Sequence, residues 1–439
     1  MSRLLIRNGM ILTLDVAGTY FERGTLVIDG DRIVSVGDGS VQVTEKPGDE
    51  TIDASGKIVM PGLIDLHYHT ALGKGYNDHL PLWEYLDECW YPIVRAVDPE
   101  AAYWAALVSY TESIKAGVTT VNDMYRQLGA LAQAAEDIGI RAVLSSDAAL
   151  PGHGLDTLAD NAGAYAANHG KAGGRIEVWV GIDWLPTVDM AFLRDARSLA
   201  DELGTGVHIH LGESMSEVED SLERFGMRPA HVYHQAGLLG PDVVAAHSVC
   251  LDDSEIRLLA ETGAHVSHNP SSNAKLGNGI ARVPEMLRSG INVGLGHDAC
   301  ECNNSADMFE VMKFASLVHR AKWSDASLMP AETVLRMATN SGARALGHET
   351  GRLEPGSKAD VILIDTDNAM FTPLITDSAA HVQSHLVFAA NGSVVDTSII
   401  DGRIVMRGRR LVFVDEKQIV REANAAFRRI RDHLVVVRR

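Results

Sequence analysis

Short apolar runs alternate with helical patterns through the middle of the chain. Between about residues 61 and 345, runs typical of buried strands alternate with segments whose apolar residues recur every three to four positions. The predicted strands are 63–66, 118–122, 141–145, 176–182, 206–211, 243–246, 265–267 and 292–295. This alternation indicates βα units and a parallel sheet. Eight such units fit a (β/α)8 TIM-type barrel, with a doubly wound sheet as the structural alternative.

The helices between these strands carry start and stop signals. Asp98 is a predicted N-cap with Pro99 in the first turn, and Gly117 ends the long helix that follows. Thr187 is a candidate N-cap for a second helix. The predicted amphipathic helices include 99–116, 128–137, 188–203, 254–262, 283–289 and 307–320.

Both ends of the chain have a different pattern, rich in short β segments. Asp29-Gly30-Asp31 and Asp401-Gly402 are tight-turn signals between such segments. We therefore expect the two ends to pair as one small β-sandwich domain. The predicted division is 1–60 for the first part of the sandwich, 61–357 for the barrel, 358–412 for the second part of the sandwich and 413–439 for a C-terminal helix.

Composition narrows the class of protein. The 439 residues are 46% hydrophobic and 22% charged, with a net charge of −19. An acidic chain of this kind is not expected to bind nucleic acid, and its apolar runs are shorter than the roughly 20 residues of a membrane span. The N-terminus lacks the pattern of a signal peptide. Four cysteines are too few for a disulfide framework in so long a chain, so a cytoplasmic location is expected.

The most informative segment is 61–69, PGLIDLHYH, in which an apolar run ends in His67 and His69. Side chains at i and i+2 of a strand point to the same face. Both imidazoles can therefore face one cation such as Zn²⁺, at nitrogen distances of about 2.0–2.1 Å.

Further polar side chains stand where other predicted strands end. His210 and Glu213 follow the fifth strand, His247 the sixth and Asp298 the eighth. In a parallel barrel these ends meet on one face, where catalytic residues gather. Three histidines and an aspartate form a plausible first shell that leaves a position for water.

These segments resemble the amidohydrolase superfamily, and especially the branch of S-adenosylhomocysteine deaminases, guanine deaminases and triazine hydrolases. The resemblance covers nearly the whole chain and implies the barrel and the β-sandwich. The segments that carry it are 61–69, 112–120 (ESIKAGVTT), 210–213 (HLGE), 267–273 (SHNPSSN), 294–298 (GLGHD), 307–309 (DMF) and 356–360 (GSKAD).

The resemblance implies a role for each matched residue. His67, His69, His210 and Asp298 fall on metal ligands, Glu213 on a proton-shuttling glutamate and His247 on a further catalytic histidine. Asp298 also matches a catalytic group that accepts a proton from water. The predicted fourth strand, 175–183, has no lysine of the kind that bridges two metals in binuclear relatives. One divalent ion is therefore expected, Zn²⁺ first and Fe²⁺ as the alternative.

The chemistry of these groups predicts a metal-dependent hydrolytic deaminase. A bound metal lowers the pKa of water to about 7, and a carboxyl group can protonate a ring nitrogen and a leaving amine. The expected substrate is a small nitrogen heteroaromatic: a purine, pterin, pyrimidine or s-triazine. Its expected contacts are Trp83, Tyr125, His268 and Asn303.

Two alternatives stay open. A hydrolase of the same fold could release chloride from a triazine or open a cyclic amide. A non-catalytic binding protein could retain the barrel, although such a protein would be expected to have lost the metal ligands.

The sequence departs from its relatives at three places near the mouth. Tyr68 stands where Thr or Gln is more usual, and His297 stands where Thr or Ser is more usual. Residues 299–304 replace a loop that is usually rich in Gly and Ser. A homo-oligomer, dimer or tetramer, is expected.

Overall fold

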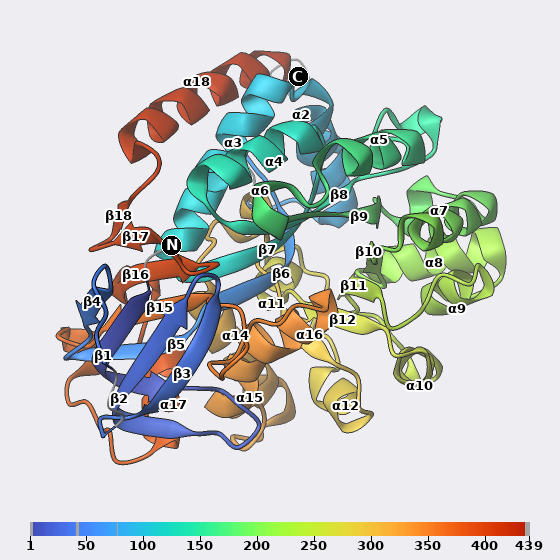
Figure 1. The fold of residues 1–439 in the computed structure, drawn as a ribbon. Helices are drawn as coiled ribbons and strands as arrows, with labels where there is room; N and C mark the ends of the chain where they lie inside the picture. Colours follow the sequence, from blue (N-terminus) through green and yellow to red (C-terminus); the bar gives the residue numbers. More distant parts are fainter. Residues whose placement is uncertain (1–2, 41–43, 77, 435–439) are drawn as a thin grey trace.

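The computed structural model describes residues 3–40, 44–76 and 78–434, and contains two sheets of nine strands each. One sheet is built from the middle of the chain, and the other joins strands from both ends. Figure 1 shows the blue N-terminal strands beside the orange and red C-terminal strands, away from the green and yellow helices of the middle segment.

The middle sheet is parallel and forms a barrel, as predicted. Its strands follow one another in chain order. They are β6 (Leu63–His69), β7 (Val118–Tyr125), β8 (Arg141–Ser146), β9 (Ile176–Ile182), β10 (Val207–Leu211), β11 (Val243–His247), β12 (His265–His268), β13 (Val293–Leu295) and β14 (Asp298–Ala299).

The eighth unit closes the barrel in two short pieces. β13 pairs with β12, while β14 pairs with β6 through Asp298 opposite Tyr68. Only Gly296 and His297 separate the two pieces. The last strand of the barrel thereby reaches the first, and the C-terminal ends of β6 and β14 lie side by side.

Helices surround the barrel and connect its strands (Figure 1). The first half contains α1 (Leu82–Tyr85), α2 (Tyr91–Ala96), α3 (Pro99–Lys115), α4 (Leu128–Ile138), α5 (Leu158–Asn168), α6 (Lys171–Gly174), α7 (Met190–Leu203), α8 (Met215–Phe225) and α9 (Pro229–Gln235). The second half contains α10 (Asp253–Thr262), α11 (Pro270–Lys275), α12 (Val283–Arg288), α13 (Cys300–Asn303), α14 (Met308–Trp323), α15 (Ala331–Arg336), α16 (Gly342–Leu346), α17 (Ala379–Phe388) and α18 (Glu416–Leu434).

The second sheet is mixed and curls around its own apolar core. A bridge joins Arg32, on the end strand β3, to Lys358, just before the central strand β15, and side chains such as Ile6, Leu26 and Val361 fill the interior. The strands are β1 (Leu4–Leu12), β2 (Tyr20–Asp29), β3 (Arg32–Asp38), β4 (Glu50–Asp53), β5 (Lys57–Pro61), β15 (Val361–Asp365), β16 (Val395–Ile400), β17 (Arg403–Arg407) and β18 (Arg410–Leu411).

β1 continues past a bulge near Asn8. One predicted helix cap differs from the structure. Thr187 does not cap α7, because it lies in a short 3-10 turn, and the Asp189 side chain accepts from the backbone N–H of Phe192 instead. The Asp98 cap of α3 is present. The pairing of both chain ends supports the proposed domain division at about residues 60, 357 and 412.

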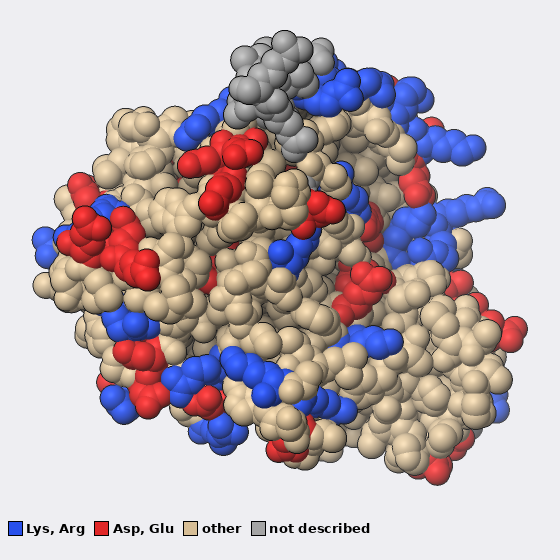
Figure 2. Space-filling view, turned by 180° about the vertical axis from the view of Figure 1, so that it is seen from behind, with Lys and Arg blue, Asp and Glu red and all other residues tan. Residues whose placement is uncertain are grey.

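Charged side chains of both signs are interspersed on the face drawn in Figure 2. Such mixing is usual for a solvated surface. Within the described residues, every helix is too short or too polar to cross a bilayer.

A buried ion pair joins the barrel to the mixed sheet. The guanidinium of Arg141, on β8, donates to Asp360 at 2.9 and 3.1 Å and to Asp401 at 3.1 Å. The Arg141 and Asp360 side chains are 6% and 1% exposed. Two carboxylates shared by one guanidinium fix how the strand β8 meets the turn after β16.

Replacing Arg141 with methionine should therefore destabilise the fold by about 3–5 kcal/mol, because it leaves buried carboxylates unpaired. Urea unfolding would measure the change. Arg429→Ala is the matched control, since Arg429 forms an exposed pair with Glu100 at 3.3 Å, and such pairs contribute about 0–1 kcal/mol. Equal effects of the two substitutions would contradict a supporting role for Arg141.

Candidate metal centre and active site

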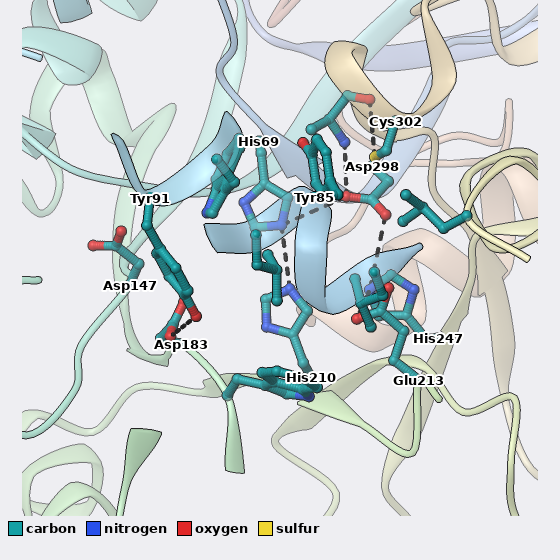
Figure 3. Close-up of a pocket in the computed structure, with 16 residues that line it drawn as sticks. His69, Tyr85, Tyr91, Asp147, Asp183, His210, Glu213, His247, Asp298 and Cys302 are labelled. Atoms are coloured by element: carbon teal, nitrogen blue, oxygen red, sulfur yellow. Dashed lines mark hydrogen bonds and ion pairs between the residues drawn. The ribbon is translucent and has the colours of Figure 1, made fainter. Parts of the chain in front are cut away.

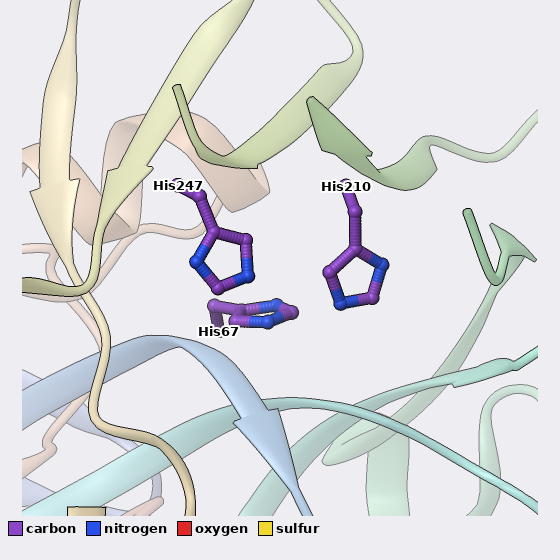
Figure 4. Close-up of side chains that lie close together, drawn as sticks. All are labelled: His67, His210 and His247. Carbon is purple, nitrogen blue, oxygen red and sulfur yellow. The ribbon is translucent and has the colours of Figure 1, made fainter. Parts of the chain in front are cut away.

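The histidines predicted to bind metal lie together at the C-terminal end of the barrel. His67 and His69 come from β6, His210 from β10 and His247 from β11 (Figure 4 draws His67, His210 and His247). One potential ligand atom from each of His67, His210 and His247 lies within 4.8 Å of the others, and the same holds for His67, His69 and Asp298. All of these residues are buried.

Hydrogen bonds fix which nitrogen of His69 can face a metal. Its Nδ1 donates to the carbonyl oxygen of Met124 at 2.6 Å. The other nitrogen, Nε2, therefore carries a lone pair, and it lies 3.2 Å from Nε2 of His210. Two nitrogen lone pairs this close repel each other unless a cation lies between them, so the approach of His69 and His210 favours a bound metal.

The spacing of the ligand atoms suits a tetrahedral ion. Nε2 of His67 and Nε2 of His69 each lie 3.6 Å from Oδ1 of Asp298. A tetrahedron with bonds of about 2.1 Å has edges of about 3.4 Å. The observed separations of 3.2 and 3.6 Å lie on either side of that value. The donor set therefore fits Zn²⁺ or a similar divalent ion.

His208 supports His67 from below the centre. Nδ1 of His67 lies 2.9 Å from Nε2 of His208, whose Nδ1 lies 3.3 Å from Oγ of Ser145. Both bonds form when His67 donates to His208 and His208 donates to Ser145. Nε2 of His67, which has no hydrogen-bond partner among the described residues, is then left with a lone pair for a metal. Burial lowers the pKa of His67 and His208 well below the ordinary value, so both rings stay neutral.

Asp298 is held by the two residues before it. A Cβ atom at Gly296 would lie 2.5 Å from Oδ1 of Asn269 and 2.8 Å from the backbone nitrogen of His67, so only glycine fits there. Nδ1 of His297 lies 2.6 Å from Oδ2 of Asp65, and both side chains are fully buried. Asp298 itself has φ 73°, a strained conformation of the kind found at functional sites.

Glu213 lies on the same wall as His247, in a setting that favours its protonated form. Its Oε1 accepts from Nδ2 of Asn278 at 2.9 Å, and its Oε2 is 3.7 Å from Nε2 of His247. Burial, followed by the negative charges of Asp298 and Glu217, raises the pKa of Glu213 well above its ordinary value. Glu217 also accepts from the backbone N–H groups of Gly212 and Glu213, at 3.0 and 2.8 Å, and so fixes the turn.

His247 completes this wall from the end of β11. Its Nδ1 lies 2.9 Å from Oδ1 of Asn273, and its Nε2 lies 3.8 Å from Oδ2 of Asp298. The backbone at His247 has φ 70°. Its ring is therefore oriented by Asn273 toward the two carboxyl groups.

Most of these groups line one cavity at the C-terminal end of the barrel. Figure 3 shows the metal-ligand candidates in the centre, Glu213 and His247 on one side, and Asp147, Asp183 and Tyr91 on the other. The apolar part of the lining is Leu82, Tyr85, Leu86, Trp90, Trp184 and Leu276.

None of the four predicted substrate contacts is among the residues that line this cavity. Trp83 packs against Trp184 and donates to Ser216, and Tyr125 packs against Trp90. His268 packs against His319, and Asn303 donates to the carbonyl of His297. Their contact with a substrate stays a prediction.

Sequence reasoning missed Asp147 and Asp183. Asp147 lies two residues past the predicted strand 141–145 and Asp183 directly follows 176–182, so the strand-end rule that points to His247 and Asp298 applies to them as well. Neither stands in a segment with an evident metal-binding pattern. The supporting roles of Glu217, Asn273 and Asn278 depend on contacts that a sequence does not display.

The sequence matches the amidohydrolase family over residues 58–405. The chain belongs to the amidohydrolase family. It is 39% identical to a 5′-deoxyadenosine deaminase of Methanosarcina mazei, covering 97% of this chain and 98% of that one. It is equally 39% identical to a 5-methylthioadenosine/S-adenosylhomocysteine deaminase of Desulforudis audaxviator, covering 98% and 99%. The predicted family is thus confirmed.

Solved structures confirm the fold of this amidohydrolase. An adenosine deaminase of Xanthomonas campestris with bound zinc superposes with a TM-score of 0.91 at 29% identity, covering 98% of this chain and 99% of that one. A triazine hydrolase of Arthrobacter aurescens superposes at 0.86 with 23% identity, covering 97% and 99%. The second likeness shows the fold alone.

Purified protein should contain about one divalent ion per chain, and His69→Ala should lower that content at least tenfold, because a tetrahedral site loses one of its ligands. Inductively coupled plasma mass spectrometry would measure it. The exposed His234 provides the control: His234→Ala should keep the wild-type content. Full metal content in His69→Ala, or two ions per wild-type chain, would contradict the assigned site.

Proposed function

We propose that this amidohydrolase is a metal-dependent deaminase that removes the 6-amino group of an adenine nucleoside, a small-molecule substrate. The proposal is supported by the two curated relatives, whose names specify adenine nucleosides and whose lengths match nearly end to end. The expected class, a hydrolase of carbon–nitrogen bonds, agrees with them. In this reaction water forms a bond to the ring carbon, the carbon–nitrogen bond breaks and ammonia leaves.

The proposed ligands of the single ion are His67, His69, His210 and Asp298. A divalent ion at this site would supply a Lewis acid that lowers the pKa of water to about 7. Zn²⁺ is the first candidate, since it is the ion named for the adenosine deaminase structure, and Fe²⁺ is the alternative. Each histidine ring is already held in orientation by a hydrogen bond, a ring contact or both.

Glu213 is the proposed proton donor, and the burial and neighbours of its carboxyl group support this role. A buried carboxyl group with a raised pKa holds its proton to a higher pH than an ordinary glutamate does. It can therefore protonate the ring nitrogen next to the attacked carbon. Asn278 holds one carboxyl oxygen, and the second oxygen faces His247.

Asp298 and His247 are the proposed partners of Glu213. Asp298 lies beside both His67 and His69, where its free oxygen can accept a proton from attacking water. His247, held by Asn273, is placed to donate to or accept from the oxygen of the tetrahedral carbon. Together the three groups move protons from water to the leaving amine without a further residue.

Glu213→Gln should retain metal and substrate affinity while lowering kcat about a thousandfold or more, because the amide keeps the shape but holds no transferable proton. Ammonia release from 5′-deoxyadenosine would measure kcat. Glu219→Gln, at an exposed position on the helix α8 that follows Glu213, is the control and should leave kcat unchanged. Retention of more than about a tenth of wild-type kcat in Glu213→Gln, a loss below about 1.4 kcal/mol, would exclude Glu213 as the donor.

A further inference from the structure

The wall of the pocket opposite Glu213 carries a pair of carboxyl groups that the proposed reaction does not use. Asp147 follows β8 and Asp183 follows β9, and Figure 3 shows both on the side of the cavity away from Glu213 and His247. They are 2% and 6% exposed. Neither takes part in the metal-ligand cluster.

Asp147 lacks the partners that a structural carboxyl group normally has. Among the described residues, neither of its side-chain oxygens has a hydrogen-bond partner, although both are buried. Buried carboxylates with a structural role usually accept several hydrogen bonds. Oδ2 of Asp183 accepts from the hydroxyl of Tyr91 at 3.1 Å. The pair therefore has unused acceptor capacity that faces the cavity.

The cations whose charges act on this pair donate their hydrogen bonds elsewhere. Arg126, which acts on Asp147, donates to Asp156 at 2.9 Å, and Arg95, which acts on Asp183, donates to the carbonyl oxygen of His153 at 3.0 Å. None of the described residues that line the cavity is lysine or arginine, whereas four are acidic: Asp147, Asp183, Glu213 and Asp298. This wall therefore offers acceptors to a hydrogen-bond donor and no cationic side chain to a phosphate or carboxylate group on a ligand.

The two carboxyl groups are held rigidly by the strand ends that carry them. The side-chain oxygen of Asn161 accepts from the backbone N–H groups of Ser146 and Gly181, at 3.0 and 3.2 Å. The backbone N–H of Asp183 donates to the carbonyl of Ala148 at 3.0 Å. A Cβ atom at Gly181 would lie 2.0 Å from the carbonyl oxygen of Ser146, so glycine permits this close approach. The pair is thus preorganised, as a binding subsite requires.

We propose that Asp147 and Asp183 form a specificity subsite for a donor-rich substituent of the substrate, such as a vicinal diol or an ammonium group, and exclude substrates whose substituent is an anion. The inference rests on the proposed function, because it places the heterocycle between this pair and Glu213. It narrows the substrate class from adenine derivatives in general to those that carry an uncharged or cationic tail.

In the empty cavity, burial disfavours the charged forms of this pair, and a bound hydrogen-bond donor would favour those forms. Burial raises the pKa of Asp183 to about 7, although the Tyr91 hydroxyl opposes the shift. Burial, then the charges of Asp156 and Asp183, raise the pKa of Asp147. A donor bound between the two groups would replace lost hydration, so the cost of burying them is recovered when ligand is present.

Four adenine derivatives test the subsite by calorimetric titration: 5′-deoxyadenosine with a diol, 9-(3-aminopropyl)adenine with an ammonium group, 9-ethyladenine with neither, and adenosine 5′-monophosphate with an anion. Asp147→Leu should weaken binding of the first or second compound about ten- to a hundredfold, the range for hydrogen bonds to charged groups. It should leave 9-ethyladenine unchanged. Asp147→Asn, which keeps an acceptor oxygen, should impair the ammonium compound more than the diol and so tells the two donors apart.

Asp87→Asn is the matched control, because Asp87 is exposed on the segment that supplies Leu86 and Trp90 to the lining. It should leave all four affinities unchanged. Equal losses for 9-ethyladenine in Asp147→Leu, no loss for either donor compound, or tighter binding of the monophosphate than of 5′-deoxyadenosine would overturn the subsite. Asp183→Leu repeats the test if Asp147→Leu does not fold. Absence of ammonia release from every compound would refute the proposed function, while the titrations would still decide the subsite.

Discussion

The site depends on the way the eighth barrel unit meets the first. β13 pairs with one neighbour and β14 with the other, and the two residues between them carry the chain across the barrel mouth. Gly296 allows the close approach, and the buried His297–Asp65 pair anchors the crossing to β6. Because His67 and His69 lie on that same strand, this one contact brings Asp298 within reach of both histidines.

A second level of order comes from neutral hydrogen-bond partners that orient charged or metal-binding groups. Met124 holds His69, His208 holds His67, Asn273 holds His247 and Asn278 holds Glu213. Buried polar groups need such partners, since an unpaired one costs about 1–3 kcal/mol. Each support also selects a tautomer or protonation state, so the packing around the site sets its chemistry as well as its geometry.

The two walls of the cavity divide the work of an aminohydrolase. The wall with Glu213 and His247 lies beside the proposed metal ligands and suits the proposed proton transfer, whereas Asp147 and Asp183 lie on the other side of the cavity and suit the proposed recognition. Both walls are acidic, but only the first lies beside Asp298 and the metal-ligand histidines. Because the two pairs differ in their distance from the proposed metal ligands, similar carboxyl groups can serve proton transfer on one wall and substrate recognition on the other.

The sequence by itself determined the barrel, the mixed sheet from both chain ends and the proposed ligand set, because period, turn residues and strand-end position are local properties. It also pointed to Glu213, three residues past His210. Only the tertiary structure decided which side chains face the cavity. Trp83, Tyr125, His268 and Asn303 are near the mouth in sequence but are not among the residues that line the cavity, whereas Asp147 and Asp183 line it. Side-chain direction at a strand end depends on loop packing across several βα units, which no single segment of the chain encodes.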